Sequence, residues 1–222
     1  PIFNPGMGMI LPKQERPDLP WTPVKAKPAR DNFDSPTLGS EWYFVRIPQK
    51  AFHNQANGQL ALTLQPEIVD SLVNSAMIIQ KTRHHQFKAT TLLNFQTKKD
   101  NEQAGLILYR TANGYYSLLK DKSGIALIKK HLGKREIIEH IPYNKQEVFL
   151  SVAVNGTEIQ FSFGETQEHM TNIGSIQNVA PLSDNKFNKF NGTGVGVYAT
   201  SNGKQSRNKA LYDWFEYISD KN

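Results

Sequence analysis

Pairs of carboxylate side chains are the first candidates for chemistry, because cleavage of a glycosidic bond usually needs two of them, one on each side of the bond. Sandwich enzymes that cut β-glucans carry both groups on one strand in the spacing Glu-x-Asp-x-x-Glu, which does not occur in this chain of 222 residues. Glu136 and Glu139 are the nearest substitute, with Lys134 and Arg135 beside them. This mixture of charges is typical of an exposed hairpin edge, so we expect the chain to lack glycosidase activity.

Metal and nucleophile chemistry has little support in the sequence. The chain has no cysteine, which excludes disulfides, thiolate metal sites and a cysteine nucleophile. His84 and His85 are adjacent, and neighbouring side chains of a strand point to opposite faces, so we expect one inside and one exposed rather than two ligands of one metal. The glycines between Gly192 and Gly196 lead into a strand pattern instead of a helix, which argues against a dinucleotide site.

Charge and hydropathy limit the partners. The chain holds 26 Lys+Arg and 20 Asp+Glu, so its formal net charge is +6. The basic residues are scattered, and the densest group, Lys129, Lys130, Lys134 and Arg135, fits a solvated hairpin and lacks the aromatic-basic pattern of RNA-binding strands. No apolar run approaches the roughly 20 residues that cross a bilayer. We therefore expect neither a nucleic acid nor a membrane as partner.

Alternation with a period of two dominates the chain and predicts β-strands. From Phe87 to Phe95 the odd positions are mostly apolar and the even positions mostly polar, as in a strand that covers a core on one side. Residues 148–154 and 159–163 alternate in the same way around Asn155-Gly156, which predicts a hairpin. Residues 104–109 are apolar at both parities, which predicts a central strand covered on both faces.

Turn signals separate these strands throughout the chain. Asn-Gly or Ser-Gly pairs that can adopt positive φ occur at 57–58, 113–114, 123–124, 191–192 and 202–203. No stretch keeps a long helical period, although Pro66 to Ile78 could hold a short helix or an irregular loop. These patterns predict an all-β sandwich of two antiparallel sheets.

Proline divides the chain into two parts. Seven of the twelve prolines lie before residue 30, so we expect residues 1–29 to be an extended connector and residues 30–222 to form the sandwich domain. The sequence opens with Pro1 rather than with Met and a signal peptide, which is the pattern of a processed protein or of a piece of a longer one.

Several segments, in order, resemble the C-terminal β-sandwich of glycoside hydrolase family 43, the β-xylosidase and α-L-arabinofuranosidase group. The run 31–38 with Trp42 and 46–48 is similar to the opening signature of that domain. Residues 103–109 followed by Tyr115-Tyr116 resemble its central strand pair, and residues 210–217 resemble its closing strand. The match departs from the family at Gln80-Lys81, where members often carry paired arginines, and this difference bears on which sugar is preferred.

The resemblance implies a concanavalin A-like jelly roll and a division of labour. In this family the catalytic carboxylates lie on a five-bladed propeller that precedes the sandwich in the same polypeptide. The chain is then an accessory module that packs on the propeller and shapes a pocket for xylan- or arabinan-derived oligosaccharides. For the compartment, we expect a secreted or periplasmic bacterial protein rather than a cytoplasmic one. Two alternatives stay open, a freestanding carbohydrate-binding module and a structural cap without sugar contact.

The resemblance also implies site residues. It points to Phe190, with Phe187 as second choice, as the aromatic that a sandwich loop places at the mouth of the propeller pocket; burial of both rings in the core is the alternative. Sandwiches of this type can hold a structural Ca²⁺ where the opening and closing strands meet, and Asp31 and Asp213 are the candidate ligands. For these aspartates the alternative is a role in turn hydrogen bonds.

Overall fold

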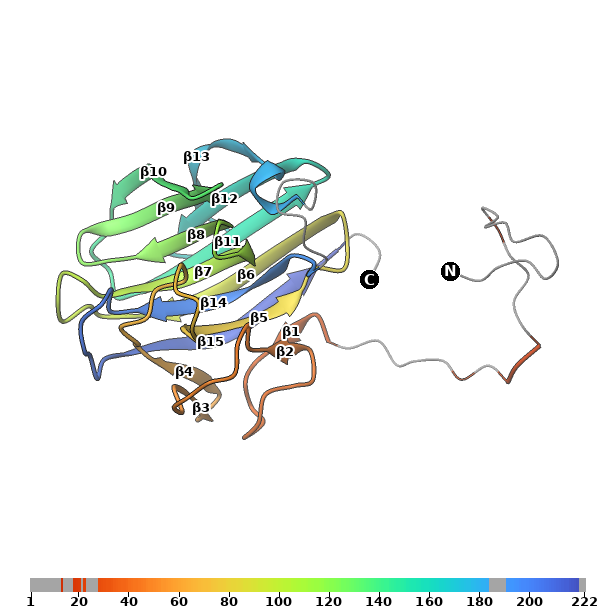
Figure 1. Ribbon diagram of the computed structural model, residues 1–222, viewed down its shortest axis with the longest axis horizontal. Helices are drawn as coiled ribbons and strands as arrows, with labels where there is room; N and C mark the ends of the chain where they lie inside the picture. The colour runs from red at the N-terminus through yellow and green to blue at the C-terminus, as the bar shows by residue number, and fades with distance from the viewer. Residues whose placement is uncertain (1–12, 14–17, 21, 23–27, 184–190, 220–222) are drawn as a thin grey trace.

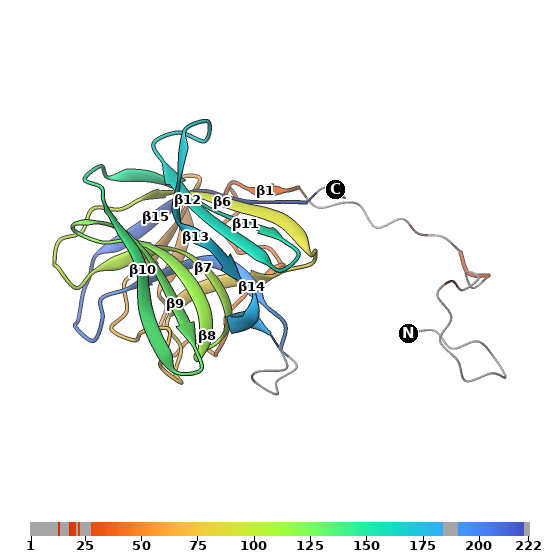
Figure 2. The same cartoon turned by 90° about the horizontal axis from the view of Figure 1, so that it is seen from above.

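The chain forms a β-sandwich, as the alternation predicts. The computed structural model describes residues 13, 18–20, 22, 28–183 and 191–219. In this part of the chain there are fifteen strands and one short 3₁₀ helix, η1 (Ala180–Leu182), and the strands stack as two layers (Figures 1 and 2). No helix within the described ranges has the length and apolar character needed to cross a membrane.

One layer, which we call the β15 sheet, has the strand order β13-β12-β11-β6-β15-β4-β3, and β1 pairs with one end of β15. Its strands are β1 (Arg30–Asp31), β3 (His53–Ala56), β4 (Gln59–Thr63), β6 (Gln86–Asn94), β11 (Glu147–Asn155), β12 (Glu158–Gly164), β13 (Met170–Asn178) and β15 (Lys209–Ile218). All pairs of neighbouring strands are antiparallel, including the predicted β11–β12 hairpin at Asn155-Gly156.

The other layer, the β14 sheet, has the order β10-β9-β8-β7-β14-β5-β2. Its strands are β2 (Trp42–Tyr43), β5 (Ala76–Lys81), β7 (Gln103–Thr111), β8 (Gly114–Lys120), β9 (Gly124–His131), β10 (Lys134–Pro142) and β14 (Gly194–Thr200). These pairs are antiparallel as well. In each sheet one of the last two strands of the chain lies between strands from the first half.

The main core lies between the two sheets and follows the predicted alternation. On β6 the inward positions Phe87, Ala89, Thr91 and Leu93 are buried, and Lys88 on the other face is exposed. Strand β7 of the other sheet contributes inward residues of its own to the same cluster. Burial of this apolar surface is the main force that holds the two sheets together.

A second apolar cluster covers the outer face of the β14 sheet. It contains alternate residues of β5, β7, β8, β9 and β14, among them Ile107 and Tyr115, and it includes Val69 from the connection between β4 and β5. Both faces of β7 are therefore buried, which confirms the prediction for residues 104–109. The segment from Pro66 is an irregular loop as far as Ser75, and residues 76–78 belong to β5, so the helix alternative for this segment is wrong.

The turn signals are only partly correct. Asn57-Gly58 and Asn202-Gly203 adopt positive φ as expected. Gly124 does not, and its lack of a side chain serves packing instead, because a Cβ there would lie 2.1 Å from the carbonyl oxygen of Ile141. The β9–β10 hairpin turns at Leu132-Gly133, and Leu132 has φ 50° there. Positive φ is unfavourable for leucine, so the sequence pattern does not predict a turn at this residue.

Candidate functional site

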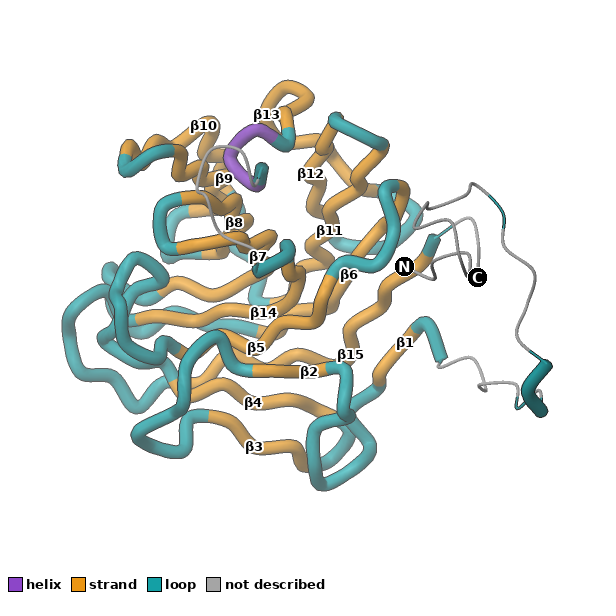
Figure 3. The backbone as a smooth tube through the Cα atoms, turned by 45° about the vertical axis from the view of Figure 1, so that its right-hand side comes forward, coloured by secondary structure: helices purple, strands orange, loops and turns teal. Residues whose placement is uncertain are grey.

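Phe187 and Phe190 belong to residues 184–190, which lie outside the described residues. The residues on either side are placed: Ser183 follows η1, and Asn191 precedes β14. Both lie at one end of the sandwich, near the β5–β6 connection (82–85) and the β11–β12 turn, and Figure 3 shows η1 beside the ends of the neighbouring strands. We call this end of the sandwich the rim.

The rim encloses a cavity of about 340 Å³. Its lining combines apolar side chains with hydroxyl, imidazole and guanidinium groups: Thr82, His84, His85, Phe87, Leu108, Arg110, Val154, Gly156, Ile159, Val179, Leu182, Ser183 and Thr193. The described lining contains no aspartate or glutamate. The cavity can therefore donate hydrogen bonds and offer apolar surface, but its described walls hold no carboxylate acid or base.

Backbone hydrogen bonds fix the connections that form the rim. The Thr82 N–H donates to the carbonyl oxygen of Thr193 at 3.0 Å, and the Gly156 N–H donates to that of His85 at 2.9 Å. Asn191 Nδ2 donates to the carbonyl oxygen of Arg110 at 2.9 Å. The point at which the chain enters β14 is thus tied to β7 and to the β5–β6 connection.

Tyr217 of β15 packs against the β5–β6 connection. Its hydroxyl oxygen accepts the Arg83 N–H at 3.0 Å, and the Arg83 guanidinium lies 5.0 Å from the centre of its ring. Phe87 also stacks on that ring, with the two ring centres 4.8 Å apart. The aromatic pair therefore gives the connection a rigid base even though it has no strand geometry.

Positive charge gathers at the rim. Burial and then the charge of Arg110 lower the pKa of Lys81, and burial lowers the pKa of Arg110. The Lys81 ammonium lies 5.0 Å from the centre of the Tyr43 ring and donates to the carbonyl oxygen of Asn191. Burial, with a smaller contribution from Tyr109, raises the pKa of Tyr43 to about 12, so this phenol stays neutral beside the ammonium at neutral pH.

His84 and His85 lie in the β5–β6 connection rather than on a strand. His84 is half-buried, with Nδ1 3.4 Å from the Tyr217 hydroxyl, and His85 is exposed, so the predicted difference in burial is confirmed. Both line the rim cavity, however, because a connection lacks the alternation that would separate them. Within the described ranges, no group of three or more His, Asp or Glu side chains is arranged to hold a metal ion.

The structure gives Glu136 and Glu139 ordinary surface roles at the β9–β10 edge. Glu136 pairs with Lys129 at 3.1 Å, and Glu139 accepts the Gly174 N–H at 2.6 Å. A different pair, Glu147 and Glu165, lines an open depression. The Glu165 side chain is 56% exposed and ion-paired with Lys145, as expected of solvated carboxylates rather than of a catalytic pair.

Asp31 and Asp213 lie on the paired strands β1 and β15. The Asp31 carboxylate accepts the Phe33 N–H at 2.9 Å and the Trp42 indole N–H at 2.7 Å, and Asp213 accepts from the Gln59 amide. These are hydrogen bonds of the kind that the alternative role predicts. A carboxylate oxygen has further lone pairs, so the bonds leave calcium coordination as a prediction to be tested.

Apart from His84 and His85, the sequence pattern did not identify the polar side chains that line the rim. Thr82, Arg110 and Thr193 belong to three separate segments, and only the fold brings them together. Arg110 carries the one visible signal, since it is a charged residue that directly follows the apolar run of β7.

Residues 30–218 match a family model described as the β-xylosidase C-terminal concanavalin A-like domain. Among curated proteins, the chain is similar to the non-reducing end α-L-arabinofuranosidase BoGH43B of Bacteroides ovatus, with 29% identity over 209 residues, 90% of this chain and 39% of that protein. It is also similar to a xylosidase/arabinosidase of Butyrivibrio fibrisolvens, with 26% identity over 226 residues, 97% of this chain and 43% of that protein. The chain thus spans about two fifths of the length of these relatives.

Among solved structures, the chain is similar to the GH43 protein BlXynB from Bacillus licheniformis. The TM-score is 0.84 and the identity 26%, over 92% of this chain and 42% of that one. The sandwich found here therefore corresponds to a part of that larger protein.

Proposed function

Because the chain belongs to the family of β-xylosidase C-terminal concanavalin A-like domains, we propose that it is the non-catalytic sandwich module of a glycoside hydrolase acting on xylan- or arabinan-derived oligosaccharides. The names of the relatives, an arabinofuranosidase and a xylosidase/arabinosidase, support this substrate class. The chain's share of their length supports a partner within the same polypeptide, which we propose to be a catalytic propeller domain.

The rim carries this proposal. Its cavity presents hydrogen-bond donors and apolar walls, and the described lining has no carboxylate. Glycoside hydrolysis needs a carboxylate pair. A surface of this composition suits contact with a second domain and with the substrate held there, while the acid and base come from that domain.

Phe190 is the residue through which we propose that the module reaches the substrate pocket, with Phe187 as the second choice. The placed residues on either side of 184–190 support this role, because Ser183 lines the rim cavity and Asn191 is bonded to the Arg110 carbonyl at the same end. An aromatic ring on the substrate would shield apolar sugar surface from water, which stabilises the complex by about 1 kcal/mol.

The test uses the full-length enzyme. Phe190→Ala should raise KM about fivefold, the equivalent of about 1 kcal/mol, with little change in kcat and in melting temperature. Phe149→Ala is the matched control and should leave KM unchanged, because Phe149 is half-buried against Trp214 of the same sheet and does not line the rim cavity. A large loss of stability with unchanged kinetics would show that Phe190 belongs to the core.

The isolated chain should show no turnover of an aryl β-xyloside. The variants Glu147→Gln and Glu165→Gln provide the sharpest check, because these two carboxylates line one depression. Activity of the pure chain that either variant abolished would contradict the accessory role.

We also propose that Asp31 and Asp213 contribute to a structural calcium site, with main-chain oxygens completing the shell of 6–8 ligands. At a free calcium concentration of ten times Kd, binding to the folded state alone would stabilise it by about 1.4 kcal/mol. The melting temperature should therefore rise with calcium and fall with chelator, and Asp213→Asn should remove the difference. Equal melting temperatures in the two conditions would reject the site and leave the turn hydrogen bonds as the role of both residues.

A further inference from the structure

A second pocket, with a lining that shares no residue with the rim cavity, lies on the outer face of the β14 sheet. Its volume is about 190 Å³, large enough for several water molecules and in the range of one sugar ring. Three alternate residues of β8, Tyr115, Ser117 and Leu119, form its floor, and they point away from the core between the sheets. The remaining walls come from Ile68, Val69, Asp70, Gln103, Arg135, Tyr198 and Asn202.

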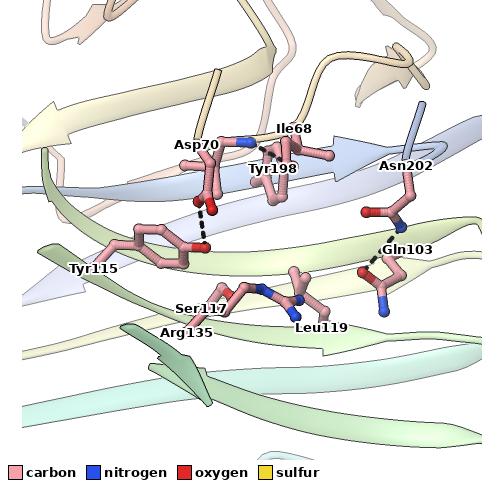
Figure 4. A pocket seen from close by; sticks show the side chains of 10 residues that line it. Ile68, Asp70, Gln103, Tyr115, Ser117, Leu119, Arg135, Tyr198 and Asn202 are labelled. Carbon is pink, nitrogen blue, oxygen red and sulfur yellow. Dashed lines mark hydrogen bonds between the residues drawn. The ribbon is translucent and has the colours of Figure 1, made fainter. Parts of the chain in front are cut away.

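The lining has the mixed character that saccharides require. Figure 4 shows Asp70 and Tyr115 at one end of the pocket, Gln103 and Asn202 at the other, and Arg135, Ser117 and Leu119 between them. Apolar side chains can face the C–H groups of a sugar ring, and amide, carboxylate and guanidinium groups can bind its hydroxyls. The pocket offers both donors and acceptors, which suits a neutral polyol better than an anion or a cation.

Hydrogen bonds hold the polar groups in place before any ligand binds. The Tyr115 hydroxyl donates to Asp70 Oδ1 at 2.7 Å, and Lys130 pairs with Oδ2 of the same carboxylate. At the other end, Asn202 Nδ2 donates to the Asn101 carbonyl oxygen at 2.7 Å and to Gln103 Oε1 at 3.2 Å. This leaves the Gln103 NH₂ group free to donate, in a fixed position, to a ligand oxygen.

Ser117 supplies a hydroxyl to the floor of the pocket. The residue lies between Tyr115 and Leu119 on β8 and lines the pocket with them. A serine hydroxyl can both donate and accept a hydrogen bond, which suits a sugar hydroxyl. The hydroxyl lies on the pocket floor, where the oxygen of a bound sugar would reach it.

We propose that this pocket binds one pentose unit of a xylo- or arabino-oligosaccharide, as an ancillary site separate from the rim. The choice of sugar rests on the proposed function, whereas the existence of a neutral saccharide site rests on the pocket itself. Gln103 at one end of the pocket and Asp70 at the other bind ring hydroxyls, and Arg135, Ser117 and Leu119 contact the ring between them.

The test is titration of the 222-residue chain with xylotriose and, separately, with arabinotriose, followed by calorimetry and by backbone amide shifts. We expect binding of one of the two, with shifts concentrated on β8 and on residues 68–70. Gln103→Ala and Ser117→Ala should each weaken binding about fivefold, the effect of one lost hydrogen bond. The matched control is Gln177→Ala on β13, which should not affect binding, because the Gln177 amide donates to the nearby Ser175 and does not line the pocket.

The outcomes separate the alternatives. If Ser117→Ala leaves sugar affinity unchanged, the serine is a packing residue, and an unchanged Gln103→Ala affinity as well would overturn the proposal. Absence of binding by either trisaccharide, or shifts confined to the rim, would also overturn it. Neither result would affect the proposed function, which the KM of the full-length Phe190 variant tests independently.

Discussion

The rim cavity and the outer-face pocket share a strand but differ in construction. β7 contributes Arg110 to the rim at one end and Gln103 to the pocket at the other. The rim is formed largely by turns and connections that backbone hydrogen bonds tie together. The pocket lies on a sheet face and is held by bonds between side chains. A surface made of connections can adapt to another domain, whereas a braced sheet face suits a small ligand of fixed shape.

The largest effect should come from removing the brace of the outer-face pocket. Asp70→Ala leaves the Tyr115 hydroxyl and the Lys130 ammonium without their acceptor, and the Lys130 side chain is only 12% exposed. We expect a loss of about 3 kcal/mol in the free energy of unfolding, measured with urea. Asp70→Asn, which keeps an acceptor for Tyr115, should lose less. If both variants lose the same small amount of unfolding free energy, the side-chain bonds of the pocket stabilise the fold no more than those of the rim do.

A smaller effect is expected at Glu102, which precedes Gln103 and steadies the loop after β14. Its carboxylate is 1% exposed and accepts from the Lys98 N–H at 2.7 Å, from the Ser206 hydroxyl at 2.7 Å and from the Asn208 amide at 2.8 Å. Glu102→Gln places a donor among these donors and should cost about 2 kcal/mol at pH 7. The same variant should also lower the affinity of the pocket for sugar, because Asn202, which lines the pocket, lies in the loop that Glu102 holds.

The pH dependence of stability provides a second measurement on Glu102. Burial raises the pKa of this carboxyl, but the hydrogen bonds from Ser206, the Lys98 N–H, Asn208 and the Lys99 N–H outweigh burial and lower it. The ionised form therefore stabilises the fold. Its contribution is complete above the unfolded-state pKa of about 4.3 and is lost as the pH falls through the lower native value. In this acid range the free energy of unfolding of the Glu102→Gln variant should fall less steeply with decreasing pH than that of the wild type. If the two proteins show the same slope, Glu102 does not contribute to the pH dependence.

The smallest effect on stability should come from the rim. Lys81→Ala removes an exposed ammonium that bonds to the Asn191 carbonyl and contacts the Tyr43 ring, and we expect a cost of about 0.5 kcal/mol. Lys88→Ala, an exposed lysine on β6, is the control and should be close to neutral. A cost above 2 kcal/mol at Lys81 would mean that the rim is braced as strongly as the sheet face, which would remove the contrast between the two sites.

Much of the fold could be predicted because its strands cover a core on one side. The alternation from Phe87 to Phe95 and the Asn155-Gly156 turn are local signals, and the structure follows both. The contacts that bury the outer face of the β14 sheet join segments that lie far apart in the sequence. Val69 donates its N–H to the hydroxyl of Tyr198, far along the chain, and no periodicity reveals which loop returns to which sheet.

The sites were harder to predict for the same reason. Asp70, Gln103, Ser117 and Arg135 come from four separate segments, and no local pattern groups them as one site. Phe190 was reached only through a family resemblance, and it lies outside the described residues. His84 and His85 show the opposite case, since a strand rule applied to a connection predicted divergence where the two side chains share a cavity.

The central position of β14 and β15 has a consequence for how the protein acquires its structure during synthesis. β14 joins β5 to β7, and β15 joins β4 to β6, so each sheet stays in two separate halves until these last strands are available. A nascent chain that ends before residue 194 can form hairpins but neither complete sheet. Because long-range pairings of this kind form late and slowly, we expect the domain to reach its native state only after almost the whole chain has left the ribosome. Until then the edges of β5, β6 and β7 are exposed, and this is the interval in which chaperones would matter most.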